Sequence, residues 1–126
     1  STVVSGKLSV ENKTNKGELQ KWEKTGWRET SSESKPGVIK RLKWSHMADR
    51  MKYDLLPEVS KLTMPVLMIV GDKDDSTPLE HQKILFDKLL GKKEIHVIKN
   101  APHTFKDPVH LKEIKDIFDK WIKNNL

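Results

Sequence analysis

The stretch MPVLMIVGDKDDSTP, from Met64 to Pro78, decides the fold. Its apolar run, residues 66–70, has no polar alternation and lies between a proline and a glycine. Such a run is typical of a strand that is buried on both faces of a parallel sheet. The polar segment that follows should therefore lie at the carboxyl end of a strand, and it contains Asp72, Asp74 and Asp75.

The residues after this segment predict a helix over residues 78–90. Thr77 can act as its N-cap, Pro78 suits the first helical position, and Glu80 would complete a capping box. Gly91 follows at the place where a left-handed C′ residue commonly ends a helix.

A second strand and a terminal helix are predicted in the remaining residues. Residues 94–99 carry Ile95, Val97 and Ile98, and a loop with His103 follows them. Asp107 is expected to cap the last helix, which Pro108 opens. The apolar stripe of that helix has the spacing of a helix packed on a sheet and consists of Leu111, Ile114, Phe118, Trp121 and Ile122. The order strand, helix, strand, helix predicts an α/β fold with parallel strands and flanking helices.

Chemistry in such sheets lies at the carboxyl ends of the strands. An acidic residue after the first strand and His103 after the second can meet there. A carboxylate that binds the imidazole fixes its tautomer and lets it act as a general base. Asp74 is the predicted acid, with Asp75 one residue away as its competitor, and Asp72 is expected to bind backbone amides of the turn.

These residues carry a resemblance to the closing segment of α/β-hydrolases. Gly71, Asp74 and Pro78 match the G-x-x-D-x-x-x-P pattern, whose Asp is the triad acid in that family, and "APHTF" around His103 matches the loop of the triad histidine. The resemblance covers residues 61–126 and implies an esterase-, lipase- or acyl-peptidase-like hydrolase. It also implies that residues 1–61 correspond to the mostly helical lid of these enzymes and that residues 62–126 form the C-terminal part of the hydrolase domain.

The first half of the chain has a weaker pattern. A short helix is expected from Glu18 to Trp27, stopping at Gly26, and a longer one over residues 38–53. Short strand or loop pieces are expected at residues 3–4 and 8–10. Large aromatic residues could line an acyl pocket or pack the lid onto the body, and the substrate-binding candidates are Trp22, Trp27 and Trp44.

The chain departs from the hydrolase pattern in one respect. It contains no G-x-S-x-G nucleophile elbow. We therefore expect a C-terminal fragment of a serine hydrolase that is inactive alone, with a non-catalytic binding or scaffold domain of the same fold as the alternative. The expected partners are an acyl ester substrate and either the missing N-terminal half or a second copy, bound at the exposed edge of strand 66–70.

Composition argues against several other classes. The net charge of +6 comes from scattered lysines with few arginines, so a solvated surface and no nucleic acid partner are expected, and a basic module that binds nucleic acid or lipid headgroups is the remaining alternative. No apolar run is long enough to span a membrane, and the absence of cysteine fits a reducing, cytoplasmic location. No metal or other cofactor is expected, because His46 and Asp49 have the spacing of ligands on one helix face but lack a third. The remaining histidines are expected to be surface or packing residues: His81, His96 and His110.

Overall fold

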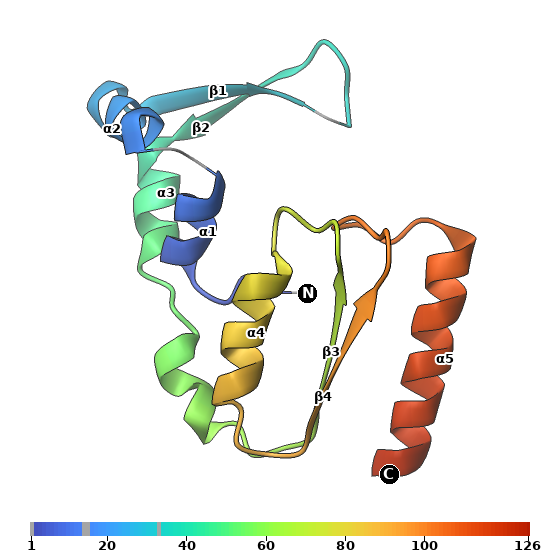
Figure 1. Cartoon of the computed structure of the whole chain (residues 1–126). Helices are drawn as coiled ribbons and strands as arrows, with labels where there is room; N and C mark the ends of the chain where they lie inside the picture. The colour runs from blue at the N-terminus through green and yellow to red at the C-terminus, as the bar shows by residue number, and fades with distance from the viewer. Residues whose placement is uncertain (1, 14–15, 33) are drawn as a thin grey trace. The chain divides into compact units, whose positions relative to one another are not determined.

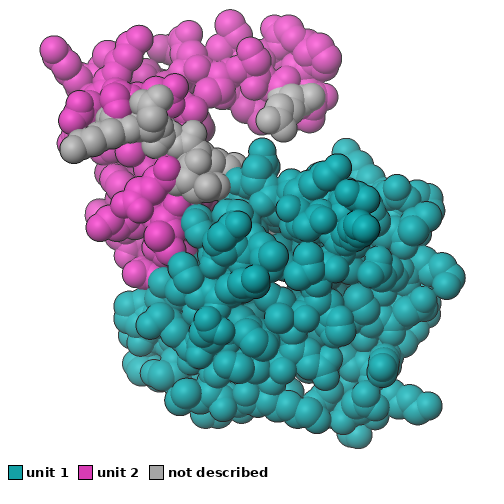
Figure 2. All heavy atoms as spheres, viewed as in Figure 1, with its two compact units in different colours: residues 1–4, 55–126 teal, residues 5–54 magenta. Residues whose placement is uncertain are grey.

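The computed structural model describes residues 2–13, 16–32 and 34–126. The chain forms two compact units, which Figure 2 colours separately. One unit comprises Ser5–Asp54, and the other comprises Ser1–Val4 with Leu55–Leu126. We call them the N-terminal unit and the C-terminal unit. The segment Leu55–Lys61 thus groups with the strands that follow it.

The C-terminal unit is built on two parallel strands. β3 (Val66–Gly71) pairs with β4 (Lys93–Ile98), in a register that aligns the first residues of both strands and the last residues of both strands. α4 (Leu79–Lys88) connects them, and α5 (Pro108–Asn125) follows β4. The two helices lie on opposite faces of the strand pair (Figure 1). The predicted order of strand, helix, strand and helix is confirmed.

The core of this unit lies between the sheet and α4. Side chains that point from the strands to this face meet α4 and the 3-10 helix η1 (Leu56–Lys61), because alternate residues of a strand share one face. The fully buried members of this cluster are Val4, Val59, Met68, Leu85 and Leu89. Burial of these side chains stabilises the unit by roughly 1.5–3 kcal/mol for each large apolar residue.

The opposite face, beneath α5, is only partly covered. Leu67 and Ile69 of β3 point to this face and are half-buried. All residues of α5 are described and none is fully buried, and the Phe118 side chain of its apolar stripe stays 49% exposed. The stripe was predicted correctly, but in this chain it has more apolar surface than the two strands can cover.

Of the predictions about helix ends, two are wrong and one is confirmed. Thr77 is not the N-cap of α4: Pro78 holds that position, and no side chain caps the helix. Gly91 does not end α4 in a left-handed conformation; a Cβ there would lie 2.5 Å from the Thr63 carbonyl oxygen, so close backbone approach is what requires glycine. Asp107 does cap α5, with its carboxylate accepting from the Val109 amide at 2.9 Å.

The N-terminal unit is a small helical module with a β-hairpin. Its helices are α1 (Gly6–Lys13), α2 (Lys16–Thr25) and α3 (Trp44–Met51). The hairpin pairs β1 (Trp27–Ser31) with β2 (Ile39–Lys43) in antiparallel order. The predicted helix over residues 38–53 is therefore wrong in its first part, and residues 8–10 are helical and not a strand piece.

Gly26 stops α2 as predicted, and its φ of 79° explains why glycine is needed there. The core of this unit consists of Val10, Trp22 and Met47. Trp22 is only 2% exposed, and its indole N–H donates to the Leu42 carbonyl oxygen at 3.0 Å. This hydrogen bond ties the hairpin to the helices of its own unit.

Candidate active site

The carboxyl ends of β3 and β4 bring two loops into contact. The last residues of the strands, Gly71 and Ile98, are paired, so the segments that follow begin side by side. A Cβ on Gly71 would lie 2.2 Å from the Ala101 carbonyl oxygen, which means that only glycine permits this approach. The same oxygen accepts a hydrogen bond from the Lys73 amide at 3.0 Å, which fixes the two loops to each other.

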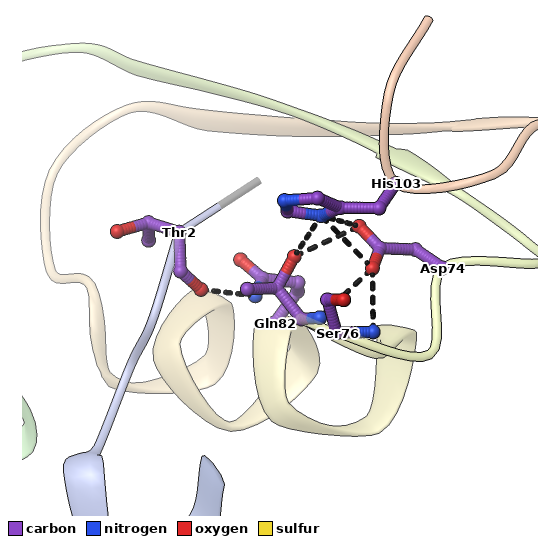
Figure 3. Close-up of polar contacts among 6 residues, drawn as sticks. Thr2, Asp74, Ser76, Gln82 and His103 are labelled. Atoms are coloured by element: carbon purple, nitrogen blue, oxygen red, sulfur yellow. Dashed lines mark hydrogen bonds and ion pairs between the residues drawn. The ribbon is translucent and has the colours of Figure 1, made fainter. Parts of the chain in front are cut away.

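Asp74 and His103 meet at this junction. The Nδ1 atom of His103 lies 3.0 Å from Oδ2 and 3.1 Å from Oδ1 of Asp74 (Figure 3). A carboxylate can only accept hydrogen bonds, so we assign the ring proton to Nδ1. The Asp74 side chain is 1% exposed, whereas that of His103 is 46% exposed. The pair thus has a buried acidic partner and an accessible imidazole.

The Asp74 carboxylate is held by its own turn. Oδ1 accepts from the Ser76 amide at 3.0 Å and from the Thr77 amide at 2.8 Å. Oδ2 accepts from the Thr77 hydroxyl at 2.8 Å. Hydrogen bonds to an ionised acceptor are stronger than those between neutral groups, so this turn orients the carboxylate before any ligand binds.

The arrangement is suited to base catalysis. With Nδ1 donating to Asp74, Nε2 of His103 is the ring nitrogen with a free lone pair, and it can accept a proton from a nearby hydroxyl. The buried carboxylate would then stabilise the imidazolium that forms. Of the two competing acids, Asp74 is the one whose carboxylate contacts His103, while Asp75 is exposed.

Two details of the turn differ from the sequence prediction. The carboxylate that binds turn amides is that of Asp74, and the prediction for Asp72 is wrong. Thr77, expected as a helix cap, binds Asp74 through its hydroxyl, and its Oγ also lies 3.3 Å from Nδ1 of His103. The signal was present in the sequence, because an aspartate commonly accepts from the amides two and three residues later.

The three tryptophan candidates all lie in the N-terminal unit. Trp22 and Trp44 pack edge to face, with ring centroids 5.7 Å apart. Trp22 and the 40% exposed Trp27 line a hollow of about 380 Å³ on this unit, together with charged residues of α2 and β1. Their role in substrate binding stays a prediction.

Two of the other histidines have surroundings of their own. His96 bonds to Glu94 through Nε2 at 3.2 Å on the α5 face of β4. His46 and Asp49 are both exposed on α3. Within residues 2–13, 16–32 and 34–126, no cluster of three or more His, Cys, Asp or Glu side chains could hold a metal ion. Among the same residues, no helix has the length and apolar character needed to cross a bilayer.

Solved structures that are similar to this chain include esterases, a lipase and an alpha/beta hydrolase domain-containing protein. Mouse alpha/beta hydrolase domain-containing protein 10 has a TM-score of 0.74 and 20% identity, covering 97% of this chain and 50% of that protein. The monoacylglycerol lipase of Paleococcus ferrophilus has a TM-score of 0.62 and 22% identity, covering 90% and 54%. Est1E of Butyrivibrio proteoclasticus, solved with ferulic acid, has a TM-score of 0.60 and 18% identity, covering 77% and 36%.

These similarities define the fold. The chain is a partial α/β-hydrolase-like domain, as its motifs predicted, and it spans about a third to a half of the length of these three structures. The sequence profile of the PhoPQ-activated pathogenicity-related proteins matches residues 28–126, and the chain belongs to that family. No curated protein sequence matches it.

Proposed function

We propose that this chain supplies the acid and the base of a serine hydrolase that cleaves an ester or related acyl bond. The observation that carries the proposal is the contact between Asp74 and His103 at the carboxyl ends of adjacent parallel strands. In the proposed reaction, Nε2 of His103 takes the proton of a serine hydroxyl as that oxygen attacks the acyl carbon. The imidazolium, stabilised by Asp74, then returns the proton to the leaving alcohol.

The attacking serine and the oxyanion-hole amides must come from outside this sequence, because it contains no G-x-S-x-G. We therefore propose that the chain is inactive alone. An acyl ester is favoured as substrate because the similar structures include a monoacylglycerol lipase and a protein solved with ferulic acid. The alternative is a non-catalytic member of the fold, which a longer protein without an elbow serine would favour.

The two flanks of α5 suggest where the rest of the sheet would bind. On the β4 side, a groove of about 500 Å³ is lined by the charged or polar side chains of Glu94, His96, Asp116, Lys120 and Asn124, together with Ile117 and Trp121. On the β3 side, a groove of about 400 Å³ is apolar and contains Leu67, Ile69, Phe105, Ile114 and Phe118. Polar side chains suit a sheet edge in water, whereas an apolar groove suits further packing. We propose that a strand adds beside β3 and that its following segment covers the apolar groove.

In the proposed whole protein, that strand belongs to the nucleophile-bearing half. When the chain is studied alone, we expect a second copy to cover the same edge. Light scattering over a wide concentration range should then detect a dimer or larger species, and Leu67→Lys should favour the monomer. A monomer at every concentration would contradict this part of the proposal.

The proposed function is tested with the protein as its source cells make it. An antibody against α5 would isolate that protein for intact mass, N-terminal sequencing and an assay with p-nitrophenyl esters. The proposal expects a G-x-S-x-G serine in the product or in a co-purified chain, together with ester hydrolysis. A product with neither would favour the non-catalytic alternative.

A further inference from the structure

We propose that the β1–β2 hairpin of the N-terminal unit is a docking surface for an anionic phospholipid membrane. This inference does not depend on the proposed hydrolase activity. It starts from the uneven distribution of charge along the chain. Residues 5–54 contain 12 Lys and Arg against 7 Asp and Glu, including all three arginines, so nearly all of the net charge of +6 belongs to this unit.

The hairpin itself is the most basic part of that unit. Between residues 27 and 43 there are five Lys and Arg against two Glu. Successive residues of a strand point to opposite faces, so Arg28 and Lys40 lie on one face of the hairpin and Arg41 and Lys43 lie on the other. Basic side chains near an anionic bilayer each add about fivefold to the binding constant.

One face of the hairpin is exposed along its whole length. The antiparallel register places Trp27 opposite Lys43, Glu29 opposite Arg41, and Ser31 opposite Ile39. All six of these residues are exposed. A solvated face is common in an antiparallel strand pair, so the exposure of this face leaves it accessible to a partner without by itself indicating one.

Apolar and aromatic side chains stand among these cations. Ile39 is 64% exposed, Val38 is 47% exposed and Trp27 is 40% exposed. The Arg41 guanidinium lies 4.5 Å from the centroid of the Trp27 ring, and the Lys43 ammonium lies 5.4 Å from it. Tryptophan with flanking Lys or Arg is the pattern of the membrane–water interface, where the ring enters the headgroup layer and the cations meet phosphate.

The exposed aliphatic pair favours a membrane over other polyanions. The apolar side chains of Val38 and Ile39 cannot hydrogen-bond to the base edges or phosphates of a nucleic acid. In a bilayer, both side chains can be removed from water. Only Glu29 opposes the cations of the exposed face, and it is already paired with Arg41 at 3.0 Å. The surface can therefore contribute to membrane binding in two ways, by electrostatic attraction and by insertion of apolar side chains.

The test is co-sedimentation of the chain with vesicles. We expect binding to vesicles of equal parts phosphatidylcholine and phosphatidylglycerol, weakened by salt, and none to phosphatidylcholine alone. The variant K40Q/R41Q/K43Q should bind on the order of 100-fold more weakly. The variant V38S/I39S, which changes no charge and replaces exposed side chains, should bind about tenfold more weakly.

The matched control removes three exposed lysines from the C-terminal unit, K83Q/K88Q/K92Q, and should change binding less than threefold. An equal loss of vesicle binding in the control would mean that binding depends only on the net charge of the chain, and it would overturn the proposal. Unchanged binding of V38S/I39S, or binding to RNA with the same affinity as to vesicles, would overturn it as well. Amide NMR spectra of each variant establish that the hairpin is still folded.

Discussion

Replacement of Thr77 by valine removes one hydroxyl from the acid–histidine junction. Valine keeps the volume and the backbone amide of Thr77, so the change removes only the hydroxyl, which donates to Oδ2 of Asp74 at 2.8 Å and lies 3.3 Å from Nδ1 of His103. The Asp74 side chain is 1% exposed, so water cannot replace the missing donor. A hydrogen bond to a charged group contributes about 1.5–3 kcal/mol, and we expect Thr77→Val to lower the free energy of unfolding of the C-terminal unit by about 2 kcal/mol.

The assay is urea unfolding followed by amide NMR signals of β3 and β4. Tryptophan fluorescence would mix the units, because three of the four tryptophans lie in the N-terminal unit. Thr77→Ser should restore most of the loss, and the exposed Thr104→Val serves as the matched control, with an expected change below about 0.5 kcal/mol. Wild-type stability in Thr77→Val, or an equal loss in Thr77→Ser, would refute the reasoning.

Three further changes test the junction and its supports. Asp74→Asn should reduce the population of His103 rings protonated on Nδ1, measured by imidazole ¹⁵N shifts. Asp75→Asn should leave that population unchanged, and the reverse result would identify Asp75 as the acid. Gly71→Ala should destabilise the C-terminal unit by about 3 kcal/mol, because the alanine Cβ would lie 2.2 Å from the Ala101 carbonyl oxygen. An unchanged urea midpoint of unfolding would contradict this prediction. Asp107→Ala removes the N-cap of α5 and should cost about 1 kcal/mol, and unchanged amide exchange in the first turn of that helix would speak against the cap.

The secondary structure of the C-terminal unit could be predicted from the sequence because it depends on local sequence patterns. An apolar run bounded by proline and glycine predicted β3, and the spacing of apolar residues predicted the face of α5. Asp107 and Pro108 fixed the start of that helix. The meeting of Asp74 and His103 followed from one further rule, that parallel strands bring their carboxyl ends to the same edge.

One error concerned a local choice and another a non-local pairing. Thr77 could either cap the helix or bind a carboxylate, and its hydroxyl donates to Asp74, three residues earlier. The strands of the hairpin, WRETS and IKRLK, have no apolar alternation, because one face is exposed and the other combines half-buried side chains with the exposed Lys40. Their pairing across residues 32–38 is a non-local contact, and periodicity within either segment cannot reveal it.

The central claim is that His103 acts as the base of a hydrolase. The most direct measurement is kcat/KM for p-nitrophenyl ester hydrolysis by the protein as its source cells make it, compared between His103→Asn and His96→Asn. His96 also contacts a carboxylate, that of Glu94 at 3.2 Å, but it lies on β4 outside the junction, which makes it the matched control. We predict a loss of roughly 10⁴- to 10⁶-fold for His103→Asn and a change within about threefold for His96→Asn. Hydrolysis that survives His103→Asn, or that falls equally in both variants, would contradict the account.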